Sequence, residues 1–172
     1  CKSLVLLKND GVLPLQRSRN IAVIGPVADC PEILVGNYNG RPNHGVTLLE
    51  GIHREAGSMA RVYYAKGSEL ALPPNPFLDT STRNTGEAVS VARRADVVVL
   101  CLGYTPQMEG EEGDAYNADQ SGDRRDIALP ACQQKLLEDV VAVGRPVALV
   151  LTGGSPVAIP WAADNVGAIL EC

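Results

Sequence analysis

The strongest indication of the architecture is the run Asp96-Val-Val-Val-Leu-Cys-Leu-Gly103. Its apolar residues follow one another without a break, whereas a strand with one face in water alternates apolar and polar positions. A second run of the same kind, Pro146-Val-Ala-Leu-Val-Leu-Thr152, lies further along the chain. Strands of this type are typical of a parallel sheet covered by helices on both faces, so the sequence predicts an α/β protein.

Shorter apolar runs and segments with helical periodicity alternate around these two stretches. Three further strands are expected, which gives a sheet of five to six strands: Asn20–Gly25, Arg61–Ala65 and Val166–Glu171. Four helices are expected: between Thr47 and Gly57, over Glu87–Ala95, from Pro130 in its first turn to a stop at Gly144, and over Pro156–Ala163. The sequence therefore predicts a three-layer α/β sandwich, formed by a single domain over residues 1–172, with a mainly parallel sheet and helices on both faces.

The expected helix after Thr47 has clear signals at both ends. Thr47 and Glu50 have the spacing of a capping box. Gly57 follows the last helical position, where glycine is favoured. We therefore expect a helix that begins directly after Thr47 and ends before Gly57.

The composition is that of an ordinary globular domain and excludes several classes of partner. The chain has 172 residues, 45% of them hydrophobic, and a net charge of −5. The basic residues form no stripe and the longest apolar run is far too short to cross a bilayer, so neither nucleic acid nor a membrane is expected as a partner. The five cysteines lack CxxC spacing and only two histidines are present. We therefore expect buried free thiols and no metal or other cofactor.

Ligands of open parallel sheets bind at the carboxyl ends of the strands, so the loops after Gly25, Gly103 and Thr152 are the candidate sites. None of them carries a GxGxxG or Walker A sequence. The Gly153-Gly154-Ser155 stretch favours a tight turn over an anion site, because two glycines alone are a weak signal.

The loop Tyr104–Ala128 is the most informative of the three. The loop contains many more acidic than basic residues. The acidic ones are Glu109, Glu111, Glu112, Asp114, Asp119, Asp123 and Asp126, and the basic ones are Arg124 and Arg125. A solvated acidic loop explains the charge alone. An EF-hand-like calcium loop fails, because its last ligand position would fall on Ala128. Carboxyl catalysis remains, in which one carboxyl protonates a leaving-group oxygen and a second acts as nucleophile or base.

An ordered set of short motifs along nearly the whole chain resembles the α/β-sandwich domain of glycoside hydrolase family 3, the β-glucosidases and β-xylosidases. Each motif is weak alone, and their order carries the resemblance. In chain order they are Ser3–Leu15, Ile21-Ala-Val-Ile-Gly-Pro26 with Ala28-Asp29, Gly36-Asn-Tyr-Asn-Gly40, Thr47-Leu-Leu-Glu-Gly-Ile52, Ala95-Asp-Val-Val-Val99, Glu109-Gly-Glu-Glu112, Gly122-Asp-Arg124, and Leu129-Pro130 with Gln133.

The resemblance implies a catalytic pair shared between two domains. A preceding barrel domain would supply the aspartate nucleophile, and this domain would supply the general acid/base glutamate on a loop. Matching the family pattern places that role on Glu111, with Glu109 and Glu112 as alternatives, since glutamate stands at 112 where many members have glycine. Asp123 and Arg124 would support the shape of the loop.

The resulting expectation is the acid/base-bearing domain of a retaining β-glycosidase that removes terminal β-linked xylose or glucose from oligosaccharides or glycosides, with β-xylosidase slightly preferred. The chain lacks an initiator Met and stops at an apolar strand, so we expect a fragment of a longer enzyme, inactive alone without the N-terminal barrel domain. Localisation stays undetermined. The competing hypothesis is a non-catalytic ligand-binding or interaction module with a doubly wound sheet.

A few remaining residues have competing explanations. Trp161 favours core packing over a sugar platform, because Ala158-Ile-Pro-Trp-Ala162 is largely apolar. Asn37 and Tyr38 could reach a ligand, or could belong to a turn that needs its flanking glycines. His44 and His53 have no motif partner, so we expect structural or surface roles for them.

Overall fold

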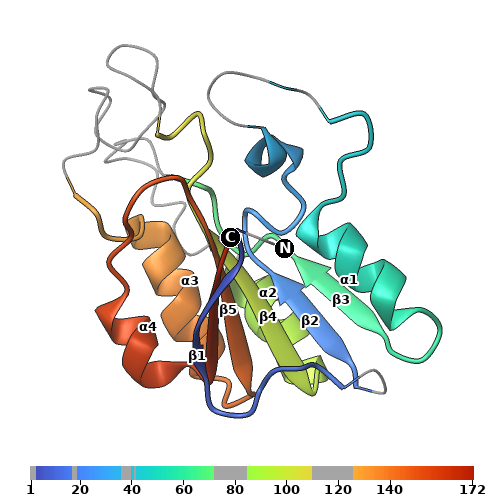
Figure 1. The fold of residues 1–172 in the computed structure, drawn as a ribbon. Helices are drawn as coiled ribbons and strands as arrows, with labels where there is room; N and C mark the ends of the chain where they lie inside the picture. The colour runs from blue at the N-terminus through green and yellow to red at the C-terminus, as the bar shows by residue number, and fades with distance from the viewer. Residues whose placement is uncertain (1–2, 17–18, 36–39, 41, 72–84, 110–125) are drawn as a thin grey trace.

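The computed structural model describes residues 3–16, 19–35, 40, 42–71, 85–109 and 126–172. Its centre is a six-stranded sheet in the order β1-β6-β5-β4-β2-β3 (Figure 1). The strands are β1 Val5–Asn9, β2 Ile21–Ile24, β3 Val62–Ala65, β4 Val97–Gly103, β5 Val147–Thr152 and β6 Ala168–Glu171. Strands β2 to β6 pair in parallel, and β1 pairs antiparallel with β6 at one edge. The expected mainly parallel sheet of five to six strands is confirmed.

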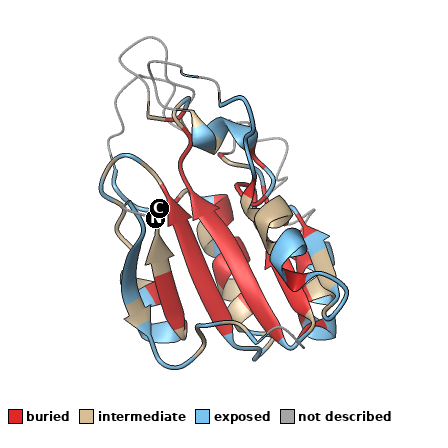
Figure 2. Ribbon diagram, turned by 45° about the vertical axis from the view of Figure 1, so that its right-hand side comes forward, coloured by how far each residue is buried: buried red, intermediate tan, exposed pale blue. Residues whose placement is uncertain are grey.

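The two central strands are buried on both faces, as their unbroken apolar runs predict. Every residue of β4 and of β5 is buried (Figure 2). Successive residues of β4 alternate between two separate cores: Val98, Leu100 and Leu102 contribute to one and Val97, Val99 and Cys101 to the other. Two cores on opposite faces of one sheet confirm the three-layer arrangement.

The helices are divided between these two faces. They are α1 Leu48–Ala56, α2 Thr85–Arg94, α3 Ala131–Val141 and α4 Pro160–Asn165, with a short 3-10 helix η1 over Pro31–Leu34. Residues of α2, α3 and α4 pack in the core that contains Leu100, and residues of α1 and η1 pack in the core that contains Val99. Each helix therefore buries its apolar face against the sheet. Among the described residues, no helix is both long and apolar enough to span a bilayer.

The cap expected at the start of α1 is present. The Thr47 hydroxyl accepts a hydrogen bond from the Glu50 amide at 3.2 Å, and it donates one to Asp29 Oδ1 at 3.0 Å. Gly57 is the C-cap residue, with a φ of 55°. The single threonine thus satisfies an amide at the start of the helix and ties α1 to the turn after β2.

Two helix starts differ from the expected positions. Pro130 is the N-cap residue of α3 and lies just outside its first turn, so that helix begins at Ala131. The expected helix over Pro156–Ala163 is wrong in its first turn, since α4 begins at Pro160. The reason is a long-range contact: Ala158 forms a parallel β-bridge with Ala128, and its amide donates to Ile127 O at 2.7 Å. A backbone used in this bridge is unavailable to a helix.

Strand β1 lies outside the strands that the sequence predicted. Its residues Val5, Leu6 and Leu7 are 49%, 54% and 51% exposed, so both faces of this edge strand are partly open. Its apolar run Leu4-Val-Leu-Leu7 is a strand signal in the sequence, but the strand is exposed at a sheet edge instead of buried as such a run predicts. Its place is fixed instead by pairing with β6, which is remote in the sequence.

Candidate functional site

Strands β2, β4 and β5 end at the same edge of the sheet, and two glycines let their ends come close together. A Cβ added at Gly103 would lie 2.1 Å from the carbonyl oxygen of Thr152, and one at Gly25 would lie 1.9 Å from that of Cys101. Both glycines also have positive φ, 131° and 130°. Only glycine fits such contacts, so the sequence makes this edge a closely packed platform for the loops that follow.

Gln133, on α3, stabilises the end of β4 through side-chain hydrogen bonds. Its fully buried side chain accepts a hydrogen bond from the Gly103 amide at 2.8 Å and donates to the Gly103 carbonyl at 2.8 Å. The same amide group donates to Leu70 O at 2.7 Å. Gln133 therefore links α3, the end of β4 and the segment after β3. The sequence offered one signal for it, a polar residue at an apolar helix position.

Tyr104 begins the acidic loop and also holds its far end. Its amide donates to Thr152 O at 2.8 Å, and its carbonyl accepts from the Thr152 hydroxyl at 3.1 Å. The side chain is 5% exposed, and its hydroxyl donates to Ala128 O. The first and last residues of the loop Tyr104–Ala128 are thus joined directly.

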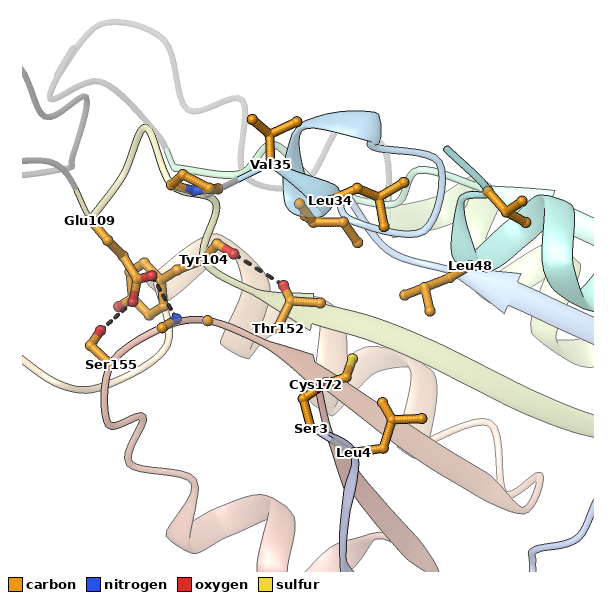
Figure 3. Close-up of a pocket in the computed structure, with 15 residues that line it drawn as sticks. Ser3, Leu4, Leu34, Val35, Leu48, Tyr104, Glu109, Thr152, Ser155 and Cys172 are labelled. Carbon is orange, nitrogen blue, oxygen red and sulfur yellow. Dashed lines mark hydrogen bonds between the residues drawn. The ribbon is translucent and has the colours of Figure 1, made fainter. Parts of the chain in front are cut away.

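Glu109 is the one described glutamate of the three acid/base candidates, and the turn after β5 binds its carboxylate. Oε2 accepts a hydrogen bond from the Gly154 amide at 2.8 Å, and Oε1 accepts one from the Ser155 hydroxyl. Figure 3 shows the side chain reaching from the acidic loop to this turn. The Gly153-Gly154-Ser155 stretch thus binds an anion that belongs to the protein itself, the Glu109 carboxylate, through the Gly154 amide and the Ser155 hydroxyl.

A cleft of about 770 Å³ opens beside this contact. Its polar lining residues include Glu109 and Ser155 on the loops after β4 and β5, Thr152 at the end of β5 and Ser3 just before β1 (Figure 3). Apolar side chains line the rest of it: Leu4, Ile33, Leu34, Val35, Val46 and Leu48. The cleft lies at the carboxyl edge of the sheet, where the sequence placed the candidate site.

The other acid/base and loop-support candidates, Glu111, Glu112, Asp123 and Arg124, lie outside the described residues, as do Asn37 and Tyr38. Trp161 packs against the core that contains Leu100, which confirms the preference for core packing. His44 and His53 are exposed on the surface.

The four cysteines that the structure describes do not supply a nucleophile to this cleft. Cys30, Cys101, Cys132 and Cys172 are free, and the first three of them are buried. Burial, with the nearby Glu32 carboxylate, raises the pKa of the Cys30 thiol to about 11. Burial, and then the charge of Glu171, also raises the pKa of Cys172, which lines the cleft. Thiols of this kind stay protonated near neutral pH and react poorly.

Within the described residues, no cluster of three or more histidine, cysteine or acidic side chains is arranged to hold a metal ion. The polar groups at the cleft are a carboxylate, hydroxyls and backbone amides, which suit hydrogen bonding and proton transfer.

A mainly parallel sheet with a core on each face defines a three-layer α/β sandwich, and the sequence decides which family of this class the chain belongs to. The profile of the glycosyl hydrolase family 3 C-terminal domain matches residues 4–172. The chain therefore belongs to glycoside hydrolase family 3.

Individual relatives agree with this assignment. The chain is 36% identical to a β-xylosidase of Formosa agariphila and 34% identical to a periplasmic β-glucosidase of Salmonella typhimurium, in each case over 99% of its own length. Among solved structures, it superposes on a family 3 exo-β-xylosidase in complex with a xylobiose aziridine probe, with a TM-score of 0.79, 30% identity and 98% of this chain covered. The chain spans about a fifth of the length of these relatives: 22%, 23% and 20%.

Proposed function

We propose that this chain is the acid/base-bearing domain of a retaining β-glycosidase that removes terminal β-linked xylose or glucose. The observation that carries the proposal is the acidic loop, joined at its base and bordering a cleft at the carboxyl edge of a family 3 sandwich domain. The remainder of the protein, a barrel domain preceding this one, would supply the aspartate nucleophile and most of the sugar-binding residues.

In the first half of the reaction, Glu111 donates its proton to the glycosidic oxygen. The bond between that oxygen and the anomeric carbon breaks while the aspartate carboxylate of the barrel domain forms a bond to the same carbon. In the second half, Glu111 takes a proton from water, whose oxygen displaces the aspartate and releases the sugar. The two carboxyl groups of retaining enzymes lie about 5–5.5 Å apart, so docking of the two domains would set this distance.

Glu111 is proposed from the family pattern, in which a glutamate lies upstream of an Asp-Arg pair, here Asp123-Arg124. Glu109 and Glu112 are the alternatives. Asp123 and Arg124 are proposed to maintain the shape of the loop through an arginine–carboxylate pair. The isolated domain is expected to be inactive, since it holds one carboxyl group of the pair.

β-Xylosidase activity is preferred slightly over β-glucosidase activity. The support is the sequence of Gly36-Asn-Tyr-Asn-Gly40 and of Glu109-Gly-Glu-Glu112, together with the similarity to relatives named as β-xylosidases. Hydrolysis of aryl β-xylosides and aryl β-glucosides side by side by the full-length protein tests this choice.

The competing hypothesis is a non-catalytic ligand-binding or interaction module, for a nucleotide-like or sugar ligand, and the Gly153-Gly154 stretch could support it by binding a ligand anion. In the structure the Gly154 amide binds the Glu109 carboxylate, so this turn gives that hypothesis no support.

The acid/base role is tested by Glu111→Gln in the full-length protein. Turnover of an aryl glycoside with a poor leaving group, such as phenol, is expected to fall by about 10²–10⁴-fold, because its departure needs a proton donor. The variant should cleave a dinitrophenyl glycoside far better than the phenyl glycoside. Azide should accelerate turnover of the dinitrophenyl glycoside, because this anion can attack the glycosyl-enzyme in place of water and needs no general base. Glu138→Gln on α3 is the matched control. Unchanged hydrolysis of the phenyl glycoside would remove Glu111 from the role.

A further inference from the structure

We propose that Glu109 is a positioning residue: the Gly154 amide and the Ser155 hydroxyl hold its carboxylate and thereby fix the start of the segment that carries the acid/base glutamate. This proposal rests on the function proposed above and assigns a distinct role to one of its alternatives.

The first support is the carboxylate itself. Both oxygens of Glu109 accept hydrogen bonds from the turn after β5, one from a backbone amide and one from a hydroxyl. The bond to the Gly154 amide is a backbone contact that does not depend on the glycine itself, since a Cβ added at Gly154 would lie at an ordinary contact distance, 3.4 Å, from Glu109 Oε2. Glu109 thus acts as an acceptor at both oxygens, whereas a general acid has to present a proton to its substrate.

The second support is the packing of the residues just before Glu109. Met108 is 1% exposed and packs in a small apolar cluster with Tyr104 and Ala71. The Met108 amide donates to Thr105 O at 2.9 Å, and the Glu109 amide donates to Pro106 O at 3.2 Å. A hydrogen-bonded turn, anchored by the buried Met108, therefore brings the Glu109 side chain to Gly154 and Ser155.

The third support is that both ends of the acidic loop are tied to one segment, residues 152–158. At the first end, Tyr104 pairs with Thr152 and Glu109 binds Gly154 and Ser155. At the other end, Ile127 O accepts from the Ala158 amide, and Ala128 forms its β-bridge with Ala158. The segment after β5 is thus the common support on which the loop is fixed relative to the sheet.

Covalent geometry connects this support to catalysis. Glu111 is two residues beyond Glu109 in the sequence, and two residues of chain span at most about 7 Å. A fixed Glu109 therefore limits where the Glu111 carboxyl can go. Because a misplacement of about 1 Å can cost a factor of about 10² in rate, loss of the Glu109 contact should weaken proton transfer without removing any catalytic group.

The experiment uses six variants of the full-length protein and one control, and the variant Glu112→Gln among them covers the third acid/base candidate. Ser155→Ala removes the hydroxyl donor and leaves all three glutamates in place, and Ser155→Thr keeps the hydroxyl. Glu109→Gln, Glu111→Gln and the double variant Glu109→Gln/Glu111→Gln separate the two glutamates. Glu138→Gln is the control, since Glu138 lies on α3 and hydrogen bonds to Gln134 of the same helix. Each is assayed for kcat and KM on phenyl and dinitrophenyl glycosides, with and without azide.

Ser155→Ala and Glu109→Gln are expected to lower kcat for the phenyl glycoside by about 10- to 100-fold with little change in KM. The dinitrophenyl glycoside should lose much less, because its leaving group needs no proton. Ser155→Thr should recover most of the loss. The double variant should be no slower than Glu111→Gln alone, because a positioning residue has nothing left to position once the acid is gone.

Three outcomes would overturn the proposal. Glu109 is itself the acid/base if Glu109→Gln lowers turnover of the phenyl glycoside by about 10²–10⁴-fold and azide rescues it, while Glu111→Gln shows neither effect. If Ser155→Ala and Glu109→Gln slow both substrates equally, or their losses multiply with that of Glu111→Gln, the contact is merely structural. If no single variant of Glu109, Glu111 or Glu112 changes the phenyl-to-dinitrophenyl ratio, the proposed function fails and this role fails with it.

Discussion

The side chain of Gln133 hydrogen bonds to both the amide and the carbonyl of Gly103, 30 residues away in the sequence. These two bonds satisfy the backbone amide and carbonyl of the last residue of β4. The side-chain amide of Gln133 takes the place that a neighbouring strand would have. A third bond, to Leu70 O, uses the remaining N–H of the amide. Gln133 is fully buried, so water cannot replace any of the three.

The first prediction follows from these three bonds. Gln133→Leu keeps roughly the same volume but leaves the Gly103 amide and two carbonyls without their partner. Because each buried unsatisfied group costs about 1–3 kcal/mol, we expect the free energy of unfolding to fall by about 3 kcal/mol or more. Urea denaturation measures it. Gln134→Leu, one position along, should cost less than about 1 kcal/mol, since among the described residues the Gln134 side chain hydrogen bonds to Glu138 of its own helix. Equal losses for the two variants would contradict this account of Gln133.

The sequence predicted the features of the fold that depend on local residues, and it did not predict those that depend on contacts between distant segments. The unbroken apolar runs of β4 and β5 were recognisable because burial on both faces needs no knowledge of the partner. The capping pair Thr47 and Glu50 was recognisable because it is local. Strand β1, by contrast, is half exposed and defined by its pairing with β6, and the delayed start of α4 follows from the bridge between Ala158 and Ala128.

The candidate site divides in the same way. Its edge of the sheet and its acidic loop followed from strand order and composition. The sequence did not predict the binding of Glu109 by Gly154 and Ser155, because these residues lie on another loop, 45 and 46 positions further along the chain. Side-chain contacts between loops depend on the packing of the strands beneath them, and no periodicity in the sequence reports that packing.

The second prediction concerns Gly103, whose close approach to Thr152 no other residue can make. An alanine Cβ would lie 2.1 Å from Thr152 O and would also force a φ of 131° on a residue with a side chain. We expect Gly103→Ala to destabilise the protein by about 3–4 kcal/mol, because β4 and β5 would have to separate. Gly144→Ala is the control: φ there is also positive, 79°, but no atom lies within 4 Å of the added Cβ. Only the conformational cost of about 1 kcal/mol is expected for it.

The third prediction uses the raised pKa of Cys30. Burial, together with a hydrogen bond to Glu32 and its negative charge, raises this pKa from 9.0 to about 11. The protonated thiol is therefore favoured in the folded protein. Its contribution to stability is complete below pH 9, where an unfolded thiol is still protonated, and is lost as the pH rises towards 11.

Alkylation by iodoacetamide, followed residue by residue with mass spectrometry, measures this effect. At pH 9 Cys30 should react far more slowly than a cysteine in an unstructured peptide, and its rate should rise steeply towards pH 11. Glu32→Gln should shift the onset of reaction to lower pH, because it removes the negative charge beside the thiol. The prediction is wrong if Cys30 reacts at the peptide rate at pH 9 in the folded protein.

The fourth prediction concerns Tyr104, whose hydroxyl joins the two ends of the acidic loop by donating to Ala128 O. Tyr104→Phe keeps the buried ring and removes the hydrogen bond to Ala128 O. We expect a loss of about 1 kcal/mol in the free energy of unfolding. In the full-length protein, kcat for a phenyl glycoside should fall more than kcat for a dinitrophenyl glycoside, because the loop that carries the proposed proton donor would be less well fixed.

Tyr64→Phe is the matched control, since Tyr64 lies in β3 and is 39% exposed. It should leave both the stability and the ratio of the two rates unchanged. If Tyr104→Phe lowers stability but slows the two substrates by the same factor, the hydroxyl serves only the fold. If the phenyl glycoside is selectively slowed, the base of the loop contributes to placing the proton donor, as the contact of Glu109 with Gly154 and Ser155 is proposed to do at the same edge of the sheet.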